Sequence, residues 1–239
     1  LICGAVAAFV AAQLKSHVVS AVKSMRERDR AVGIFGQHVS PQVAQRLIEQ
    51  SADLSAEQRH VCVLFLDIRG FSSIAAARTP AEVMDYLNEL FAPMITIVNR
   101  HGGIVNKFLG DGFMAVFGAP FEDPQLHRNA VHCSLALLDC VEKLNAAGTI
   151  PPTRLGIGIH AGPAMAGTVG SHERKEYTLL GDTVNAAARI EQETKKLGAQ
   201  IIASEAVLHD LDAERSQATT LGEITLRGIS QPLRLHRLA

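Results

Sequence analysis

The order of apolar segments along this chain predicts an α+β fold, with a ferredoxin-like βαββαβ core that carries additional strands and helices. Short apolar runs of strand type alternate with two long segments in which apolar residues recur at helical spacing. Between the second and third runs stands Gly110-Asp111-Gly112, a composition typical of a tight hairpin turn. With 239 residues, of which 47% are hydrophobic, the chain is long and apolar enough for one sizeable core.

The individual elements follow from local patterns taken in chain order. The sequence predicts a strand over residues 61–67, a helix from Thr79-Pro80 to about residue 100, strands over 104–109 and 113–117, a helix over about 126–146 and a strand over 155–159. Residues 162–170 are rich in glycine, so we expect a connection there. After it we expect a strand-like run over 177–180, a helix from Gly181 to Gly198, a strand over 201–203, a brief helix and a terminal hairpin around Gly228.

The composition of residues 1–56 predicts a membrane-proximal region, which precedes a folded domain at residues 57–239. Residues 1–12 are apolar and uncharged, but a bilayer crossing needs about 20 residues, so we expect the end of a transmembrane helix, with an amphipathic core helix as the alternative. Residues 13–56 are predicted to be a connecting or signalling helical region, whose basic residues fit a cytoplasmic flank. We therefore expect a cytoplasmic domain that is anchored at the inner or plasma membrane.

Charge and cysteine content exclude several classes of protein. The 23 Lys and Arg residues balance 24 Asp and Glu residues, so no global field attracts the chain to nucleic acid, and we expect no nucleic-acid partner. The four cysteines show neither CxxC spacing nor the density of a secreted disulfide-rich protein. We expect reduced thiols in a cytosolic domain.

Two carboxylates, Asp67 and Asp111, each stand at the exposed end of an apolar strand-type run, with glycine nearby. Brought side by side, they would form a site for hard divalent cations, as in metal-assisted phosphate chemistry. After Asp67, the run Gly70-Phe71-Ser72 offers backbone N–H groups to a phosphate chain. The alternative is that Asp67 caps a turn and Asp111 satisfies a hairpin, but the two together favour the functional interpretation.

Two further pairs of residues are candidates for binding. Asn185 and Arg189 lie four residues apart, so on a helix they share one face. Arg offers a fork of donors for phosphate oxygens and Asn can hold a ribose oxygen or an ordered water, whereas the alternative is an ordinary solvated helix face. Lys107 and Thr178 lie in strand-like runs, where a snorkelling Lys and a β-branched Thr need no special explanation. The residue patterns leave the role of this second pair open.

Four motifs in the chain resemble those of the class III nucleotide cyclase catalytic domain, specifically of adenylyl cyclases of the bacterial and soluble type. They are FLDIRGFS at residues 65–72, KFLGDG at 107–112, GIGIHAG at 156–162 and YTLLGDTVNAAAR at 177–189. The resemblance covers residues 57–239 in the order of the family. It implies a dimeric class III cyclase fold and an enzyme that converts ATP to 3′,5′-cyclic AMP and pyrophosphate.

The resemblance assigns roles to the candidate catalytic residues. Asp67 and Asp111 would bind two divalent cations, Mg²⁺ or Mn²⁺, with the backbone carbonyl of Ile68 as a further ligand. Asn185 would orient the ribose, and Arg189 would stabilise the charge that develops on the α-phosphoryl group.

The resemblance also implies which residues bind the substrate. Lys107 and Thr178 correspond to the residues that contact the purine, and Thr in the second position is typical of one subclass. Lys107 only donates hydrogen bonds, so it fits adenine N1, which accepts one, better than guanine N1, which carries a hydrogen. The Gly70-Phe71-Ser72 run and Arg227, in the last hairpin, would contact the triphosphate.

In this family the active sites form between two catalytic domains, so the resemblance implies a homodimer with two shared sites. Two alternatives remain, a catalytically silent cyclase-like module that binds nucleotide or only dimerises, and a guanylyl cyclase. A silent module is expected to lack one of the metal-binding or transition-state residues, and all of them are present here. A guanylyl cyclase requires a different pair of purine-contacting side chains.

Overall fold

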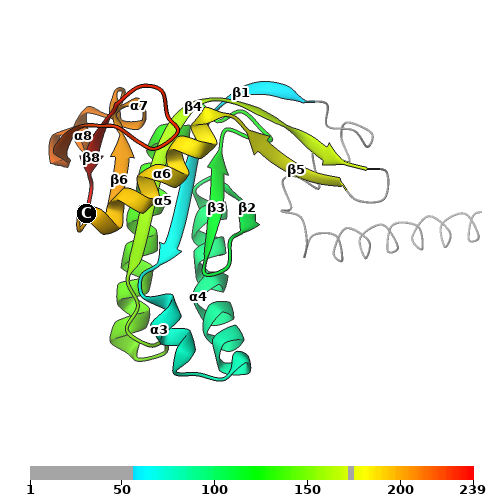
Figure 1. The fold of residues 1–239 in the computed structure, drawn as a ribbon, viewed down its shortest axis with the longest axis vertical. Helices are drawn as coiled ribbons and strands as arrows, with labels where there is room; N and C mark the ends of the chain where they lie inside the picture. The colour runs from blue at the N-terminus through cyan, green and yellow to red at the C-terminus, as the bar shows by residue number, and fades with distance from the viewer. Residues whose placement is uncertain (1–55, 172–174) are drawn as a thin grey trace, which may run out of the picture.

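The computed structural model describes residues 56–171 and 175–239 (Figure 1). The predictions for residues 1–12 and for the connecting region 13–56 lie outside the described residues, except for Ala56. Within the described part, no helix combines the length and the apolar character needed to cross a bilayer.

Apart from a short helix over Phe71–Ala76, which the sequence patterns did not predict, strands and helices follow one another in the predicted order. The strands are β1 (Glu57–Ile68), β2 (Ile104–Phe108), β3 (Gly112–Phe117), β4 (Leu155–Gly170), β5 (Lys175–Leu180), β6 (Ile201–Ser204), β7 (Thr219–Ile224) and β8 (Leu233–Arg237). The helices are α3 (Phe71–Ala76), α4 (Pro80–Arg100), α5 (Leu126–Ala147), α6 (Asp182–Lys196), α7 (Glu205–Leu208) and α8 (Asp212–Gln217). The single brief helix expected after β6 is in fact two short helices, α7 and α8.

The sheet confirms the predicted ferredoxin-like core. Its strand order is β2-β3-β1-β4-β6-β8-β7, and β5 pairs with β4 outside this path. The first four strands of this order belong to the βαββαβ unit, in which β1 pairs antiparallel with both β3 and β4, and β2 pairs antiparallel with β3. The additional strands extend the β4 edge, where β6 runs parallel to β4 and β8 antiparallel to β6.

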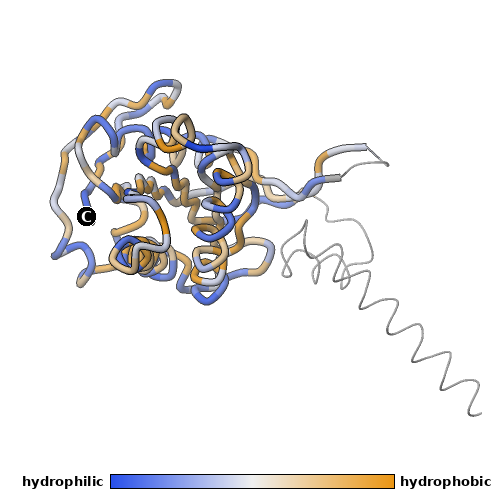
Figure 2. The backbone as a smooth tube through the Cα atoms, turned by 90° about the horizontal axis from the view of Figure 1, so that it is seen from below, coloured by the Kyte–Doolittle hydropathy of each residue, from blue (hydrophilic) through white to orange (hydrophobic). Residues whose placement is uncertain are grey.

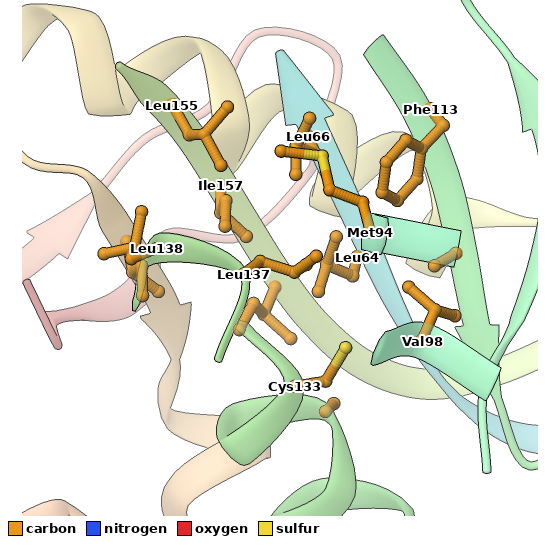
Figure 3. Close-up of a cluster of buried hydrophobic side chains, with 14 of the residues drawn as sticks. Leu64, Leu66, Met94, Val98, Phe113, Cys133, Leu137, Leu138, Leu155 and Ile157 are labelled. Atoms are coloured by element: carbon orange, nitrogen blue, oxygen red, sulfur yellow. The ribbon is translucent and has the colours of Figure 1, made fainter. Parts of the chain in front are cut away.

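Helices cover both faces of this sheet. α4, α5 and α7 pack on one face, where they bury the largest apolar cluster against β1, β3 and β4 (Figure 3). Leu64, Met94 and Phe113 meet there and are fully buried, and burial of a side chain of this size contributes about 1.5–3 kcal/mol. Cys62 and Cys133 lie in the same cluster as free thiols, as expected. Helix α6 packs on the opposite face, against β4 and β1, and lies in front of the sheet in Figure 1.

Local sequence explains where α4 begins. Thr79 Oγ1 accepts a hydrogen bond from the backbone N–H of Glu82 (3.3 Å), and the Glu82 carboxylate accepts one from the backbone N–H of Thr79 (2.7 Å). This capping box, with Pro80 at the first helical position, stabilises the first turn by roughly 1 kcal/mol. The buried side of the helix then faces the apolar cluster, as the spacing of its apolar residues predicts.

The prediction of a glycine-rich connection over residues 162–170 is wrong. β4 continues through this segment and pairs with the start of β1 and with β5. The glycines permit close approach of other segments, because a Cβ at Gly162 would lie 2.8 Å from Thr183 Oγ1 and one at Gly167 would lie 2.8 Å from Ala56 Cα. Glycine therefore serves packing here and not a turn. The outer parts of β4 and β5 form a two-stranded arm that extends from the rest of the described chain (Figure 1, Figure 2).

Candidate active site

The two predicted metal-binding carboxylates lie beside each other at one end of the sheet. Asp67 is near the end of β1, and its register partner on β3 is Gly112, the residue that follows Asp111. A larger residue cannot replace Gly112, because a Cβ there would overlap the carbonyl oxygen of Leu66. Glycine at this position therefore lets the hairpin close against β1 and brings Asp111 to Asp67.

The electrostatics of this pair fit a divalent cation. Burial raises the pKa of Asp67, and the nearby charge of Asp111 raises it further. Arg69, whose Nη1 lies 3.4 Å from Asp67 Oδ2, offsets only part of this effect. Two carboxylates in a partly buried place repel each other unless a cation lies between them, and carboxylate oxygens are the donors that Mg²⁺ and Mn²⁺ prefer. The residues present therefore suit such an ion.

The segment after Asp67 turns sharply into a short helix. Ile68 ends β1 and its side chain is buried in the core. Gly70 has a left-handed backbone conformation (φ 72°), which favours glycine, and it forms the N-cap of α3. Phe71 packs against the core, whereas Ser72 is exposed. The chain therefore turns at Gly70, and the binding of phosphate by this run stays a prediction.

A β-bulge on β2 sets the direction of Lys107. Val105 pairs with Ala115 but Lys107 pairs with Met114, so one extra residue, Asn106, stands between the two pairs. In a regular strand residues two apart point to the same face, but this shift turns Lys107 to the face opposite Val105. Val105 accordingly packs against the large apolar cluster beneath α4 and α5. Met114 packs in a second apolar cluster, on the face of the sheet that α6 covers. The bulge thus directs Lys107 to the α6 side of the sheet.

Lys107 reaches Thr178 on β5. Its Nζ donates to Thr178 Oγ1 at 3.1 Å and forms an ion pair with Glu176 Oε1 at 3.5 Å. Thr178 is buried, whereas the side chain of Lys107 is 36% exposed, so the ammonium keeps access to a ligand. The structure therefore joins the two predicted purine-contacting residues, although the local pattern around neither of them indicates the contact.

Helix α6 presents Asn185 and Arg189 away from the sheet. Its buried residues are Thr183, Ala186, Ala187, Ile190 and Thr194. Asn185 is exposed, and Arg189, which is partly exposed, donates from Nη1 to Gln192 Oε1 at 3.0 Å. Among the described residues, no hydrogen bond or ion pair joins either side chain to Asp67 or Asp111. One copy of the chain therefore does not bring the predicted transition-state residues into contact with the predicted metal ligands.

An ion-pair network that the sequence analysis missed ties β1 to α6. Arg69 Nη1 is 3.4 Å from Asp67 Oδ2, and Arg69 Nη2 is 3.0 Å from Glu191 Oε1. The same Nη2 also donates to Thr194 Oγ1. Gly156 on β4 leaves the space for this arginine, because a Cβ there would overlap the guanidinium. A glycine near the start of a predicted strand is the one signal that could have indicated such a close approach.

The pKa of Glu191 should make folding stability depend on pH. Burial raises this pKa to about 7, against an ordinary value of 4.5, although the charge of Arg69 opposes the shift. Folding therefore takes up a proton between these two pH values, so the contribution of Glu191 to the unfolding free energy is complete below pH 4.5 and is lost as the pH rises through about 7. The loss corresponds to roughly 3 kcal/mol.

We expect Glu191→Gln to flatten the fall in unfolding free energy between about pH 5 and pH 8, because the amide does not titrate. Denaturant unfolding without divalent ions measures this. The matched control is Glu142→Gln, at an exposed position on α5, which should leave the pH profile unchanged. Identical profiles for Glu191→Gln and the wild-type chain would show that Glu191 does not titrate differently in the folded state.

The remaining predicted site residue, Arg227, lies far from the carboxylates in the strand order. It is in the turn between β7 and β8, at the end of the sheet opposite to β2. Its side chain is exposed, and no described residue forms a hydrogen bond or ion pair with it. Contact between Arg227 and a triphosphate stays a prediction.

The fold and the four motifs match one family of enzymes. Residues 54–238, more than half of the chain, match the family model of the adenylate and guanylate cyclase catalytic domain. The chain therefore belongs to the class III nucleotide cyclase family. This confirms the resemblance that the four motifs indicate.

Curated relatives include proteins of mycobacteria. An uncharacterized protein of Mycobacterium tuberculosis is 40% identical over 215 residues, which cover 90% of this chain and 37% of that protein. A second uncharacterized protein of Mycobacterium tuberculosis is 38% identical over 215 residues, which cover 90% of this chain and 39% of that protein. The chain thus spans less than half the length of the curated relatives it matches.

Solved cyclases of both substrate types share the fold. The guanylyl cyclase Cya2 aligns with a TM-score of 0.68 at 28% identity, covering 76% of this chain and 92% of that chain. The adenylyl cyclase CyaB from P. aeruginosa aligns with a TM-score of 0.66 at 26% identity, covering 77% of this chain and 95% of that chain. A bacterial light-regulated adenylyl cyclase aligns with a TM-score of 0.76 at 25% identity, covering 91% of this chain and 62% of that chain. The fold alone therefore does not determine the choice of purine, which depends on side chains.

Proposed function

We propose that this chain is an adenylyl cyclase, which converts ATP to 3′,5′-cyclic AMP and pyrophosphate. The observation that carries the proposal is the contact of 3.1 Å between Lys107 Nζ and Thr178 Oγ1, at the positions where the motifs match the purine-contacting residues of the family. Adenine N1 accepts a hydrogen bond, so it suits an ammonium that only donates. Guanine N1 carries a hydrogen, so it would place a second donor opposite the ammonium. Thr178 Oγ1 can accept from the adenine amino group.

Asp67 and Asp111 bind the cations in this proposal, with the carbonyl of Ile68 as a further oxygen ligand. Two divalent ions, Mg²⁺ or Mn²⁺, would lower the pKa of the ribose 3′-hydroxyl and neutralise the triphosphate and the leaving pyrophosphate. The 3′ oxygen attacks the α-phosphorus, the bond to the bridging oxygen breaks, and the hydroxyl proton passes to solvent. Arg69 orients Asp67 through its 3.4 Å contact and anchors it to Glu191 on α6.

The residues of α6 act on the reacting phosphate and the ribose. Arg189 stabilises the charge that develops on the α-phosphoryl group, since its guanidinium offers a fixed fork of donors, and Asn185 orients the ribose. The Gly70-Phe71-Ser72 run and Arg227 bind the triphosphate. Each of these roles rests on the position of the residue in a family motif or hairpin.

Two copies of the chain are needed to complete a site in this proposal. Large apolar side chains are exposed on the β2–β3 hairpin and along the β4–β5 arm, namely Phe108, Leu109, Met165, Val169 and Leu180. Exposed apolar groups gathered in this way mark protein interfaces. A homodimer that covers these apolar side chains would place α6 of one copy opposite the carboxylates of the other copy. A single copy does not bring α6 residues Asn185 and Arg189 to its own carboxylates.

We also propose that residues 1–12 end a transmembrane helix and that residues 13–56 connect it to a cytoplasmic catalytic domain at 57–239. The apolar composition of the first segment and the basic residues after it support this. Fractionation of cells that express the full-length protein tests it. Activity that stays in the membrane pellet after a carbonate wash is expected, and activity in the soluble fraction contradicts the anchor.

Product identification separates the proposed function from its two alternatives. The purified chain, incubated with ATP or GTP and with Mg²⁺ or Mn²⁺, should form cyclic AMP and pyrophosphate in equal amounts, as measured by chromatography and mass spectrometry. Predominant cyclic GMP would identify a guanylyl cyclase, which is the activity that the similar structure Cya2 is named for. No cyclic product from a dimeric chain would identify a catalytically silent module.

Lys107→Glu should reverse the purine preference. A carboxylate accepts from guanine N1–H and opposes the lone pair of adenine N1, so the ratio of kcat/KM for ATP to that for GTP should fall by at least about 100-fold. Steady-state kinetics with both nucleotides measures the ratio. Lys143→Glu makes the same charge change at an exposed position on α5 and should leave it unchanged. An unchanged ratio in Lys107→Glu would remove this residue from purine recognition.

A further inference from the structure

A cluster of imidazoles lies where β1, the start of α5 and the end of α7 meet. His127 is in the first turn of α5, and His209 and Asp210 follow α7. One ring nitrogen or carboxylate oxygen from each of these three residues lies within 4.8 Å of those of the other two. His60 on β1 adds a third imidazole, whose Nε2 is 3.4 Å from His127 Nε2. The ring centroid of His127 is 5.5 Å from that of His60 and 5.6 Å from that of His209.

Strand geometry separates this cluster from the proposed active site. His60 and Asp67 are seven residues apart on β1, which corresponds to roughly 23 Å along the strand and to opposite faces of the sheet. Even-numbered residues of β1, such as Cys62 and Leu64, pack under α4 and α5, and His60 continues this row toward His127. The cluster therefore shares no residue with the carboxylate pair.

A hydrogen bond of His209 fixes which of its ring nitrogens is available to a cation. His209 Nδ1 lies 3.3 Å from the carbonyl oxygen of Ala206, which places a ring proton on Nδ1. His209 Nε2 lies 2.8 Å from Asp210 Oδ2. Two acceptors then face each other, unless the ring carries a second proton or a cation binds both. Burial, together with the two neighbouring imidazoles, lowers the pKa of His127 and so favours the neutral ring that can bind a metal.

We infer that His127, His209 and Asp210 bind a Zn²⁺ ion, with His60 as the fourth ligand. Imidazole and carboxylate together are typical zinc ligands, whereas Mg²⁺ takes oxygen ligands. Tetrahedral zinc with Zn–N distances of about 2.0–2.1 Å separates its ligand atoms by about 3.3 Å. The 3.4 Å between the two Nε2 atoms matches this value. The ligand atoms of His127, His209 and Asp210 lie within 4.8 Å of one another, a limit that is longer than this value. Because His209 and Asp210 are exposed, rotations of their side chains can adjust these separations.

Such an ion would cross-link the start of α5 to β1 and to the residues that follow α7. Each of these elements contributes at least one ligand, and none of the ligands belongs to the proposed active site. Because metal that binds only the folded chain stabilises it, the expected effect of Zn²⁺ at this site is on folding stability.

Cobalt(II) is a suitable probe, because a tetrahedral site with imidazole ligands gives intense visible absorption bands that an octahedral oxygen site lacks. The full 239-residue chain is stripped with a chelator and then titrated with Co²⁺ in excess Mg²⁺, which competes for the proposed oxygen-ligand site at Asp67 and Asp111. We expect tetrahedral bands that saturate at about one Co²⁺ per chain and disappear when Zn²⁺ is added. Zn²⁺ should also raise the Tm.

Variants assign the binding to this cluster. His127→Ala and His209→Ala should each weaken Zn²⁺ binding by at least about 10-fold and remove the rise in Tm. His132→Ala is the matched control, because His132 is on the same helix but contacts Glu214 at 3.0 Å, outside the cluster. His209 is exposed, so His209→Ala keeps the test valid if His127→Ala fails to fold. Equal Zn²⁺ affinity in His209→Ala and His132→Ala, or no tetrahedral bands in the wild-type chain, would overturn the inference.

Discussion

A chain with Asp67→Ala mixed with a chain with Asn185→Ala should recover cyclase activity that neither variant has alone. Each variant by itself should lose about 100- to 1,000-fold in kcat, because one lacks a proposed cation ligand and the other lacks the residue proposed to orient the ribose. In the heterodimer, one of the two shared sites would take intact carboxylates from one copy and an intact α6 from the other. The heterodimer should therefore regain about half of the activity of the wild-type dimer.

Two different affinity tags isolate the heterodimer, and cyclic AMP formation measures the recovery. The control mixes Asp67→Ala with Asp111→Ala. Both variants lack a cation ligand, so no intact site can form in that mixture. A verified heterodimer of Asp67→Ala and Asn185→Ala that stays inactive would show that the sites are not shared between copies.

Gly158→Ala should reduce activity by displacing α6. A Cβ at this position of β4 would lie 2.6 Å from Glu191 Cα and 2.8 Å from the carbonyl oxygen of Ala187, both of them backbone atoms of α6. The helix must move away from the sheet, which costs about 1–3 kcal/mol of folding stability. Because α6 carries Asn185 and Arg189, a shift of about 1 Å should lower kcat by about 100-fold.

Thermal unfolding and steady-state kinetics, the latter well below the Tm, separate these two effects of Gly158→Ala. Gly148→Ala is the control for lost stability. Gly148 ends α5 in a left-handed conformation (φ 66°) with open space around it, so the substitution should cost about 1 kcal/mol without moving α6. Activity should then be retained in Gly148→Ala and lost in Gly158→Ala. Wild-type kcat in Gly158→Ala would show that catalysis does not depend on this packing of α6.

Local sequence patterns determine much of this fold and of the candidate site. α4 and α5 are predictable because helical periodicity, and for α4 also the capping box at Thr79, lie within a few turns of the chain. The neighbouring positions of Asp67 and Asp111 are predictable once Gly110-Asp111-Gly112 is taken as a hairpin next to β1. The same local rule failed at residues 162–170, where glycine permits close packing within a strand instead of a turn.

The sequence by itself thus determined the α+β core, the motifs and the family to which they belong. Only the tertiary structure decided the direction of Lys107 toward Thr178, the ion pair of Arg69 with Glu191, and the meeting of His60 with His127 on α5. The physical reason is common to all three. Strand register, burial and pKa depend on neighbours that are far apart in the chain, so no local window of sequence contains the groups that determine them.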